Sequence, residues 1–214
     1  MFSGIIQHVG LVRRLSSEGA GKRLAIDIGP LAEGLARGDS VAVAGACLSV
    51  ADSQGGVAEF DVMAETFSHT TIGDLYVGAK INLERSLRLG DGLEGHLVAG
   101  HVDGVARVAA VGRQRGHILE FQATRELTDL MVAKGSVAID GVSLTLTDVS
   151  GTAFSVALVP ITLAKTTLGQ LAPGARVNVE TDVIGKYVLK YLRSIGEHSG
   201  GGLTLEKLRE AGFA

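Results

Sequence analysis

Three side chains that could do covalent or proton-transfer chemistry stand in short segments next to glycine. Cys47 lies in Gly45-Ala46-Cys47-Leu48-Ser49, Ser143 lies in Gly141-Val142-Ser143-Leu144-Thr145, and His101 follows Gly100. An imidazole titrates near neutral pH, so His101 is suited to carry a proton. A thiolate at Cys47 would be a nucleophile. These residue types favour proton transfer and nucleophilic addition.

Each of these residues also has a purely structural interpretation. A lone cysteine between Ala46 and Leu48 is more often a small buried hydrophobe than a nucleophile. Ser143 and Thr145 alternate along a predicted strand, so both could simply face solvent.

Other polar residues fit turns and loops as well as they fit a site. Asp140-Gly141 is a strong turn dipeptide. His96 and His101 could be loop histidines, and Glu65-Thr66 could begin a helix.

The chain repeats itself at an offset of 96 residues, which places residues 4–86 on residues 100–182. So many matches at one unbroken offset indicate one small fold made twice, and the period is too long for a solenoid repeat. The copies differ at polar positions, so we expect two similar units that treat their ligands differently. The differing pairs are Cys47 and Ser143, Ser49 and Thr145, Ile5 and His101, Ala44 and Asp140, and Glu65 and Ile161.

Short β-rich runs broken by glycine must position these side chains. In the first copy they cover residues 10–12, 24–28, 40–43, 47–50, 57–62 and 80–84. Several alternate apolar with polar residues, as half-buried strands do. Six short strands in each copy predict an all-β fold of small closed barrels or sandwiches, and closure removes exposed edges.

Two helical insertions are expected in each copy, and a helical tail follows. The first pair covers residues 30–35 and 124–133, and the second pair follows Thr66 and Thr162 and stops at Gly73 and Gly169. In the tail, residues 186–193 have an apolar seam at helical spacing, residues 199–202 form a flexible joint, and residues 203–210 form a second short helix. The first tail helix is interpreted as an oligomer contact, with packing on its own barrel as the alternative. The predicted domains are residues 1–86, 87–186 and 187–214.

Composition excludes several classes of protein. A net charge of −3, only 4% aromatic residues and no Trp disfavour binding to nucleic acid. No apolar run is long enough to span a membrane, and the first residues lack the pattern of a secretory signal. One cysteine excludes an internal disulfide and fits a reducing, cytoplasmic compartment. Six scattered histidines give no metal-binding spacing, and the glycines of residues 90–95 lack the strand and helix that a dinucleotide fingerprint needs.

Six motifs, in order along this duplicated frame, resemble the riboflavin synthase family of the alpha-chain type, a lumazine-binding repeat family. The resemblance runs from residue 1 to about residue 192 and includes the end of the tail, Glu210-Ala211-Gly212-Phe213. The motifs are Met1-Phe2-Ser3-Gly4-Ile5-Ile6, Gly45-Ala46-Cys47-Leu48-Ser49-Val50, Glu65-Thr66, Gly95-His96-Leu97-Val98-Ala99-Gly100-His101-Val102-Asp103-Gly104, Ile139-Asp140-Gly141-Val142-Ser143-Leu144-Thr145 and Asp182-Val183-Ile184-Gly185-Lys186-Tyr187.

The resemblance implies two six-stranded Greek-key β-barrels from an internal duplication, plus a C-terminal α-helix. It implies a dismutation without a cofactor or metal, in which two molecules of 6,7-dimethyl-8-ribityllumazine exchange a four-carbon unit. The products would be riboflavin and 5-amino-6-(D-ribitylamino)uracil, in the final step of riboflavin biosynthesis. It further implies a homotrimer held partly by the helix after Lys186, with each site between barrels of adjacent subunits. Association with lumazine synthase would be compatible with this assembly.

The resemblance also assigns roles to residues. His101 would carry a proton, and Ser143, Thr145 and Asp140 would form a hydrogen-bonding cluster. Cys47 would add to ring carbon C7 or contact it, and Phe2 would help to exclude water. The expected catalytic residues are His101, Ser143, Cys47, Asp140 and Ser40. The expected substrate-binding residues are Phe2, Gly4, Ile5, Ile6, Cys47, Leu48, Ser49, Asp61, Val62, Met63, Ala64, Glu65, Thr66, Gly100, His101, Val102, Lys134, Ser143, Leu144, Thr145, Leu158, Val159, Pro160, Ile161, Thr162 and Leu163.

The chain departs from the family pattern at two positions. It has Ala44-Gly45 where the family has Asn-Gly, and Ile161 where the family has His or Glu. Both changes remove a polar side chain. The alternative function is therefore a non-catalytic protein of the same family that binds a lumazine or a flavin. An oligonucleotide-binding barrel is disfavoured by the acidic balance and the few aromatic residues.

Overall fold

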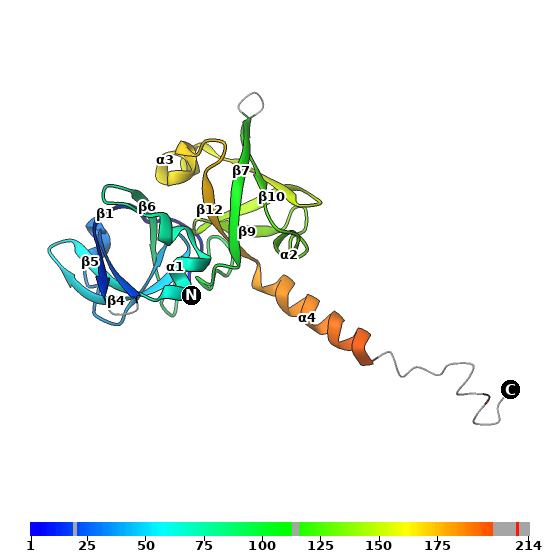
Figure 1. Cartoon of the computed structure of the whole chain (residues 1–214), viewed down its shortest axis with the longest axis horizontal. Coiled ribbons are helices and arrows are strands. Elements are labelled where there is room, and N and C mark those ends of the chain that lie inside the picture. The colour runs from blue at the N-terminus through cyan, green and yellow to red at the C-terminus, as the bar shows by residue number, and fades with distance from the viewer. Residues whose placement is uncertain (19–20, 113–115, 199–208, 210–214) are drawn as a thin grey trace.

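Twelve strands form two closed antiparallel barrels of six strands each in the computed structural model, which describes residues 1–18, 21–112, 116–198 and 209 (Figure 1). The predicted all-β class, with two six-stranded barrels and a C-terminal helix, is confirmed. The N-barrel contains β1 (His8–Glu18), β2 (Gly21–Asp27), β3 (Ser40–Val43), β4 (Ala46–Gln54), β5 (Val57–Val62) and β6 (Lys80–Arg85). The C-barrel contains β7 (Gly104–Gly112), β8 (His117–Gln122), β9 (Ser136–Ile139), β10 (Val142–Ser150), β11 (Ala153–Leu158) and β12 (Arg176–Thr181).

The two barrels repeat each other in topology and in irregularities. The strand order of the N-barrel is β1-β2-β5-β4-β3-β6, and the C-barrel has the equivalent cyclic order. Because β2 pairs with β5 and not with β3, each barrel is a Greek key. The register shift between Val50 and Asp52 in β4 recurs between Leu146 and Asp148 in β10. The duplication is therefore structural as well as sequential.

Each barrel has its own apolar core, built from the alternate residues along each strand that face inward. In the C-barrel, the rings of Phe121 and Phe154 stack with their centroids 5.0 Å apart. Each fully buried Leu, Ile, Val or Phe contributes roughly 1.5–3 kcal/mol to folding. Two separate cores of this kind make each barrel a packed unit.

The helices near residues 66 and 162 differ from the sequence prediction. The structure has α1 (Ala64–His69) followed by a separate 3₁₀ turn, η2 (Thr71–Asp74), so the helix begins before Thr66 and ends before Gly73. Thr70 separates the two because its hydroxyl donates to the Thr66 carbonyl at 2.6 Å and accepts from the Ile72 amide at 3.2 Å. The second copy repeats this arrangement with α3 (Pro160–Lys165) and η3 (Thr167–Gln170).

The prediction that Gly73 stops a helix is wrong, because α1 ends at His69 and Gly73 lies within η2. A Cβ at this position would lie 2.6 Å from the carbonyl oxygen of Phe67. Glycine is needed here because the 3₁₀ turn packs directly onto the preceding helix.

The first pair of insertions is shorter than predicted. The segment at residues 30–35 forms only a 3₁₀ turn, η1 (Gly29–Ala32), and the segment at 124–133 forms only α2 (Arg125–Thr128). Leu127 and Met131 of this segment are buried in the C-barrel core. Packing of these side chains, and not helix length, fixes the segment.

The barrels exchange the short arms that precede them. We call residues 2–6 the N-terminal arm and residues 96–102 the linker arm. Ile6 packs against the core of the C-barrel, whereas Val102 packs against the core of the N-barrel. The arms pair with each other through Phe2 and Val98, whose amides and carbonyls exchange bonds of 2.7 and 3.0 Å. Each barrel is therefore completed by the arm of the other.

Two asparagines join the barrels at equivalent positions. The side-chain amide of Asn178 donates to the Ala44 carbonyl at 2.8 Å, and its oxygen accepts from the Thr71 amide at 2.7 Å. Asn82 makes the corresponding bonds with Asp140 and Thr167. Both asparagines are buried, so these bonds fix the relative orientation of the barrels.

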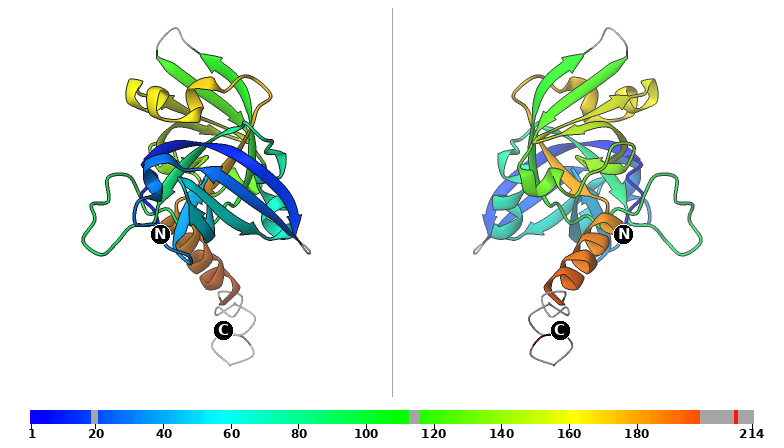
Figure 2. Two further views of the ribbon diagram at one scale, coloured as in Figure 1. Left: turned by 90° about the vertical axis from the view of Figure 1, so that its left-hand side faces the viewer. Right: turned by 90° about the vertical axis from the view of Figure 1, so that its right-hand side faces the viewer.

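The last helix, α4 (Val183–His198), leaves the C-barrel and extends away from both barrels, as Figure 2 shows. The Lys186 ammonium and an Asp103 carboxylate oxygen lie 2.7 Å apart, and the other oxygen of Asp103 accepts from the amide and hydroxyl of Thr181. These bonds set the direction in which the helix leaves. Its exposed apolar residues are Ile184, Tyr187, Val188, Tyr191, Leu192 and Ile195.

Some expectations about the chain's organisation stay predictions. The joint at residues 199–202 and, apart from Arg209, the second tail helix at residues 203–210 lie outside the described residues. The domain limits at 86/87 and 186/187 also stay predictions. Among the described residues, no helix is long and apolar enough to cross a membrane.

Candidate active site

A cavity of about 470 Å³ lies against the outer wall of the C-barrel, where Thr145 and Ala157 point away from the core. The β9–β10 hairpin supplies Ser136, Ser143 and Thr145, and the region from β11 to α3 supplies its far wall. Its remaining lining comes from outside the barrel, because Ile5 belongs to the N-terminal arm. The full lining is Ile5, Glu94, Gly95, Ser136, Ser143, Leu144, Thr145, Ala157, Val159 and Thr162.

A buried histidine backs the serine in this cavity. His96 Nδ1 and Ser143 Oγ are 2.7 Å apart, and His96 is only 8% exposed. Burial lowers the pKa of His96, and the charge of Asp182 partly opposes this effect. A neutral imidazole hydrogen-bonded to a hydroxyl is the arrangement by which a base accepts a proton through a serine.

The other imidazole nitrogen of His96 is unsatisfied. Nε2 is buried and has no hydrogen-bond partner among the described residues. Leaving a buried polar atom without a partner costs roughly 1–3 kcal/mol. Such a cost is commonly found where a group serves chemistry.

The arms hold this pair in place through close backbone contacts. The Ser143 amide donates to the Gly4 carbonyl at 2.7 Å, and the His96 amide donates to the Ser3 carbonyl at 3.2 Å. A Cβ on Gly95 would lie 2.2 Å from the Ser3 carbonyl oxygen and 2.9 Å from Ser143 Oγ. Only glycine fits this position, and it lets the linker arm bring His96 against β10.

A buried carboxylate anchors each arm. Glu84 accepts from the Ser3 amide at 2.7 Å, from the Ser3 hydroxyl at 2.6 Å and from the Gly4 amide at 2.9 Å. Glu180 accepts from the amides of Ala99 and Gly100 at 2.6 and 2.9 Å. Burial raises the pKa of both carboxyl groups, although these hydrogen bonds oppose the rise.

The equivalent position in the N-barrel holds Cys47 and His101. The Cys47 amide donates to the Gly100 carbonyl at 2.8 Å, so the next residue, the exposed His101, lies beside the N-barrel. Cys47 is a free, half-buried thiol. His101 lies in the second copy of the sequence, but the exchanged arm brings it to the first barrel.

A further cavity of about 410 Å³ lies at the N-barrel, between β2 and the start of α1. Its polar lining is charged, whereas the C-barrel cavity is lined mainly by hydroxyl and small apolar groups. The lining residues are Gly21, Lys22, Arg23, Asp61, Val62, Met63, Ala64 and Glu65.

Asp140 does not join the cluster predicted around Ser143 and Thr145. Its carboxylate accepts from the backbone amide of Asn178 at 2.8 Å, and Asp140 lines a different cavity between the barrels. Its φ of 45° is the left-handed conformation that a tight turn requires, so the turn interpretation of Asp140-Gly141 is correct. Burial raises the pKa of Asp140 to about 7.

The remaining predicted site residues are placed as follows. Phe2 is fully buried in a small cluster between the barrels that includes Ala42 and Val98, so its side chain offers no surface to a ligand. Lys134 is exposed at a φ of 69° and lies outside the lining of both cavities. Ser40 pairs with Ser49 across β3 and β4.

The other predicted residues divide by exposure. Those lining one of the two cavities are Ile5, Asp61, Val62, Met63, Ala64, Glu65, Ser143, Leu144, Thr145, Val159 and Thr162. Those that are buried or packed against a core are Gly4, Ile6, Leu48, Gly100, Val102, Leu158 and Leu163. Ser49, Pro160 and Ile161 are exposed, and Thr66 is half-buried.

Sequence reasoning missed His96 as a site residue and treated it as a loop histidine. The repeat could not identify it, because a shift of 96 residues leaves position 96 without a counterpart. The signal was its neighbour, since a glycine directly before a histidine permits close approach of the backbone. Glu94, Gly95 and Ser136 were also missed. Among the described residues, no group of three or more His, Cys, Asp or Glu is arranged to hold a metal ion.

Comparison with known proteins agrees with this geometry. The family described as the lumazine binding domain matches residues 3–86 and again residues 99–182. A riboflavin synthase of Chlamydia pneumoniae is 41% identical over 94% of this chain and 99% of that protein. A riboflavin synthase of Bacillus subtilis (strain 168) is 35% identical over the full length of both proteins.

Solved structures show the same architecture. The crystal structure of LumP complexed with 6,7-dimethyl-8-(1'-D-ribityl) lumazine has a TM-score of 0.76 and 27% identity, and it covers 85% of this chain and 99% of that one. The crystal structure of LumP complexed with riboflavin has a TM-score of 0.77 and 29% identity, with the same coverage.

Proposed function

The chain belongs to the riboflavin synthase family, and on this premise we propose that each barrel holds one molecule of 6,7-dimethyl-8-ribityllumazine. The reaction is a dismutation: one molecule gives a four-carbon unit to the other, which yields riboflavin and 5-amino-6-(D-ribitylamino)uracil. The observation that carries the proposal is the match of both barrels to the lumazine binding domain. A reaction that uses the same molecule as donor and acceptor explains why one fold occurs twice.

The C-barrel cavity supplies the proton-transfer chemistry in this proposal. The C7 methyl group of the lumazine is acidic because its carbanion delocalises into the ring. Ser143 Oγ faces the cavity and is hydrogen-bonded to His96, whose lowered pKa keeps the imidazole neutral and able to accept a proton. We assign to Ser143 and His96 the transfer of this proton, a role that the sequence predicted for His101.

The N-barrel treats its ligand differently in this proposal. Cys47 occupies the position of Ser143, and His101 occupies the position of Ile5 because the arms are exchanged. His101 is exposed and is free to approach a ring bound next to Cys47. A thiol and an imidazole are suited to stabilise the acceptor ring while the new bond forms.

A homotrimer is part of the proposal. The apolar face of α4 includes Tyr187 and Tyr191, which are 71% and 66% exposed. Met63 and Val159 at the two cavities are also exposed apolar residues. We propose that neighbouring subunits cover these surfaces, so that the N-barrel of one subunit faces the C-barrel of the next. Stacking of the two rings across this contact would supply proximity, worth several kcal/mol of the barrier. We also propose a cytoplasmic location and an association with lumazine synthase.

The enzyme and the non-catalytic alternative are separated by one assay. The purified protein receives only the lumazine, and riboflavin and the pyrimidine are followed by chromatography. We expect both products in equal amounts. Tight binding of the lumazine without either product would reject the enzyme.

Variants test the assigned pair. General acid–base groups contribute roughly 10²–10⁴-fold to a rate, so Ser143→Ala and His96→Gln should each lower kcat by about 100-fold or more. His117→Gln is the matched control, because its Nε2 is also buried without a partner among the described residues, but it does not line the cavity. Unchanged turnover in either test variant would remove that residue from the mechanism.

A further inference from the structure

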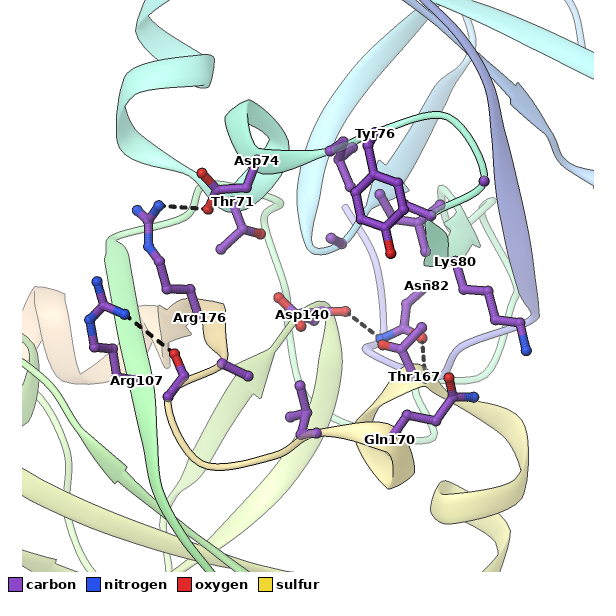
Figure 3. A pocket seen from close by; sticks show the side chains of 18 residues that line it. Thr71, Asp74, Tyr76, Lys80, Asn82, Arg107, Asp140, Thr167, Gln170 and Arg176 are labelled. Atoms are coloured by element: carbon purple, nitrogen blue, oxygen red, sulfur yellow. Dashed lines mark hydrogen bonds and ion pairs between the residues drawn. The ribbon is translucent and has the colours of Figure 1, made fainter.

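A third cavity, of about 680 Å³, lies between the two barrels (Figure 3). It shares no lining residue with the two cavities described above, so it is a separate space. This inter-barrel cleft is lined from both copies by the β3–β4 and β9–β10 turns and by the segments after η2 and η3. Its charged residues are Asp74, Lys80, Arg107, Asp140 and Arg176.

Two arginines stand directly opposite each other at one side of the cleft. Arg107 in β7 and Arg176 in β12 are cross-strand partners. Like charges in this position destabilise a sheet unless they are neutralised. Arg176 is neutralised by Asp74 at 2.6 Å, whereas the Arg107 guanidinium, among the residues that the structure describes, donates to the Gly174 carbonyl at 3.3 Å and has no carboxylate partner.

The other barrel lacks this pair. The equivalent cross-strand partners in the N-barrel are Leu11 and Lys80, so Arg107 adds a cation where the fold needs only an apolar side chain. The charge of Arg107 is therefore not required by the barrel. Its position beside a second guanidinium provides donors for an anion with several oxygens.

An aromatic ring lies across the cleft from the arginines. Tyr76 is 69% exposed, and Figure 3 shows its ring on the same side as Lys80. The equivalent residue of the second copy is Ala172, so only one side of the cleft carries a ring. Gln170 and Thr71 add polar groups to the lining of the cleft.

We propose that the inter-barrel cleft binds a phosphate monoester of an aromatic ring compound, of the nucleoside monophosphate type. The phosphate lies on Arg107 and Arg176, and the ring lies against Tyr76. Arginine side chains bind phosphate oxygens through parallel hydrogen bonds, and the anion supplies a counter-charge for Arg107, whereas Arg176 already has Asp74. The volume of the cleft is within the usual range for small-molecule sites, about 300–1,000 Å³.

Titration calorimetry with AMP, adenosine and inorganic phosphate tests the proposal on the whole protein. We expect AMP to bind more tightly than either part alone, and binding should persist when the barrels are saturated with the lumazine. Competition between AMP and the lumazine would overturn the proposal, because AMP would then occupy a barrel. Undetectable AMP binding at millimolar concentration would overturn it as well.

Two variants take their residues from the other copy of the repeat, so each new side chain is already accepted in this fold. Arg107→Leu should weaken AMP binding by about 10- to 100-fold, because a charge-assisted hydrogen bond is lost. Tyr76→Ala should weaken AMP about ten-fold and leave inorganic phosphate unchanged. Lys165→Ala, an exposed cation outside the cleft, is the control and should bind AMP normally. Equal AMP affinity in all three variants would refute the site. Riboflavin formation by Arg107→Leu should stay normal, so the result of the AMP binding test is independent of the proposed function.

Discussion

Replacing Asp140 by asparagine should remove a pH-dependent loss of stability. Burial raises the pKa of the Asp140 carboxyl group from 3.8 to about 7, and the hydrogen bond from the Asn178 amide only partly opposes this. Asparagine keeps an acceptor for that amide and tolerates the φ of 45°. The substitution therefore changes the charge of the group and little of its geometry.

The sign and size of the difference in the free energy of unfolding follow from the shift in the pKa of Asp140. A carboxyl group whose pKa is raised in the folded protein binds protons on folding, so its contribution is fully present below about pH 4 and is lost as the pH rises through about 7. A shift of about three units corresponds to about 4 kcal/mol. Because Asp140 keeps some contact with solvent, we expect about 2–4 kcal/mol. Asp140→Asn should match the original protein at pH 4 and exceed its free energy of unfolding by this amount at pH 8.

Urea unfolding followed by circular dichroism at several pH values measures the difference, since the chain has no Trp for fluorescence. Burial also raises the pKa of Glu84 and Glu180, but both carboxyl groups are present in the two proteins and cancel in the comparison. Ala44→Asn, at the equivalent turn of the other barrel, adds the same amide without removing a charge and should give a difference independent of pH. A difference between Asp140→Asn and the original protein that stays constant from pH 4 to 8 would refute the reasoning.

Three other predictions concern packing and assembly. Gly95→Ala should lower the free energy of unfolding by about 1–3 kcal/mol and lower turnover, because the new Cβ would meet the Ser3 carbonyl. Gly92→Ala is the control, because its Cβ meets only the flexible end of the Glu94 side chain. An equal loss of stability for Gly92→Ala in urea unfolding would contradict the prediction. Asn178→Ala should cost about 1–3 kcal/mol in the same assay, since it leaves buried partners in the two barrels unpaired, and a neutral effect would count against rigid coupling of the barrels. Tyr191→Glu should lower the sedimentation coefficient to that of a single chain, and an unchanged value would exclude this face of α4 from the assembly.

Local patterns in the sequence located the six strands of the first copy, although β1 and β4 are longer than the predicted runs at residues 10–12 and 47–50. The predicted runs at residues 40–43 and 57–62 have the limits of β3 and β5, because alternation of apolar and polar residues reports which side of a sheet is buried. The helices were predicted less well. Gly73 looked like a helix stop, but it permits close packing against Phe67, and this is a contact that local spacing does not encode.

The sequence by itself determined the duplication, the two barrels, the family, and the positions where the copies differ. These follow from a fixed offset and from short-range alternation, which survive without knowledge of any long-range contact. Only the tertiary structure decided which arm completes which barrel. The exchange of arms places His101 with Cys47 and brings His96 to Ser143, 47 residues away. Comparison of the copies identified the polar positions at which they differ, but it could not tell which barrel each of these side chains joins. That depends on the exchange of the two arms, which the buried Glu84 and Glu180 hold in place.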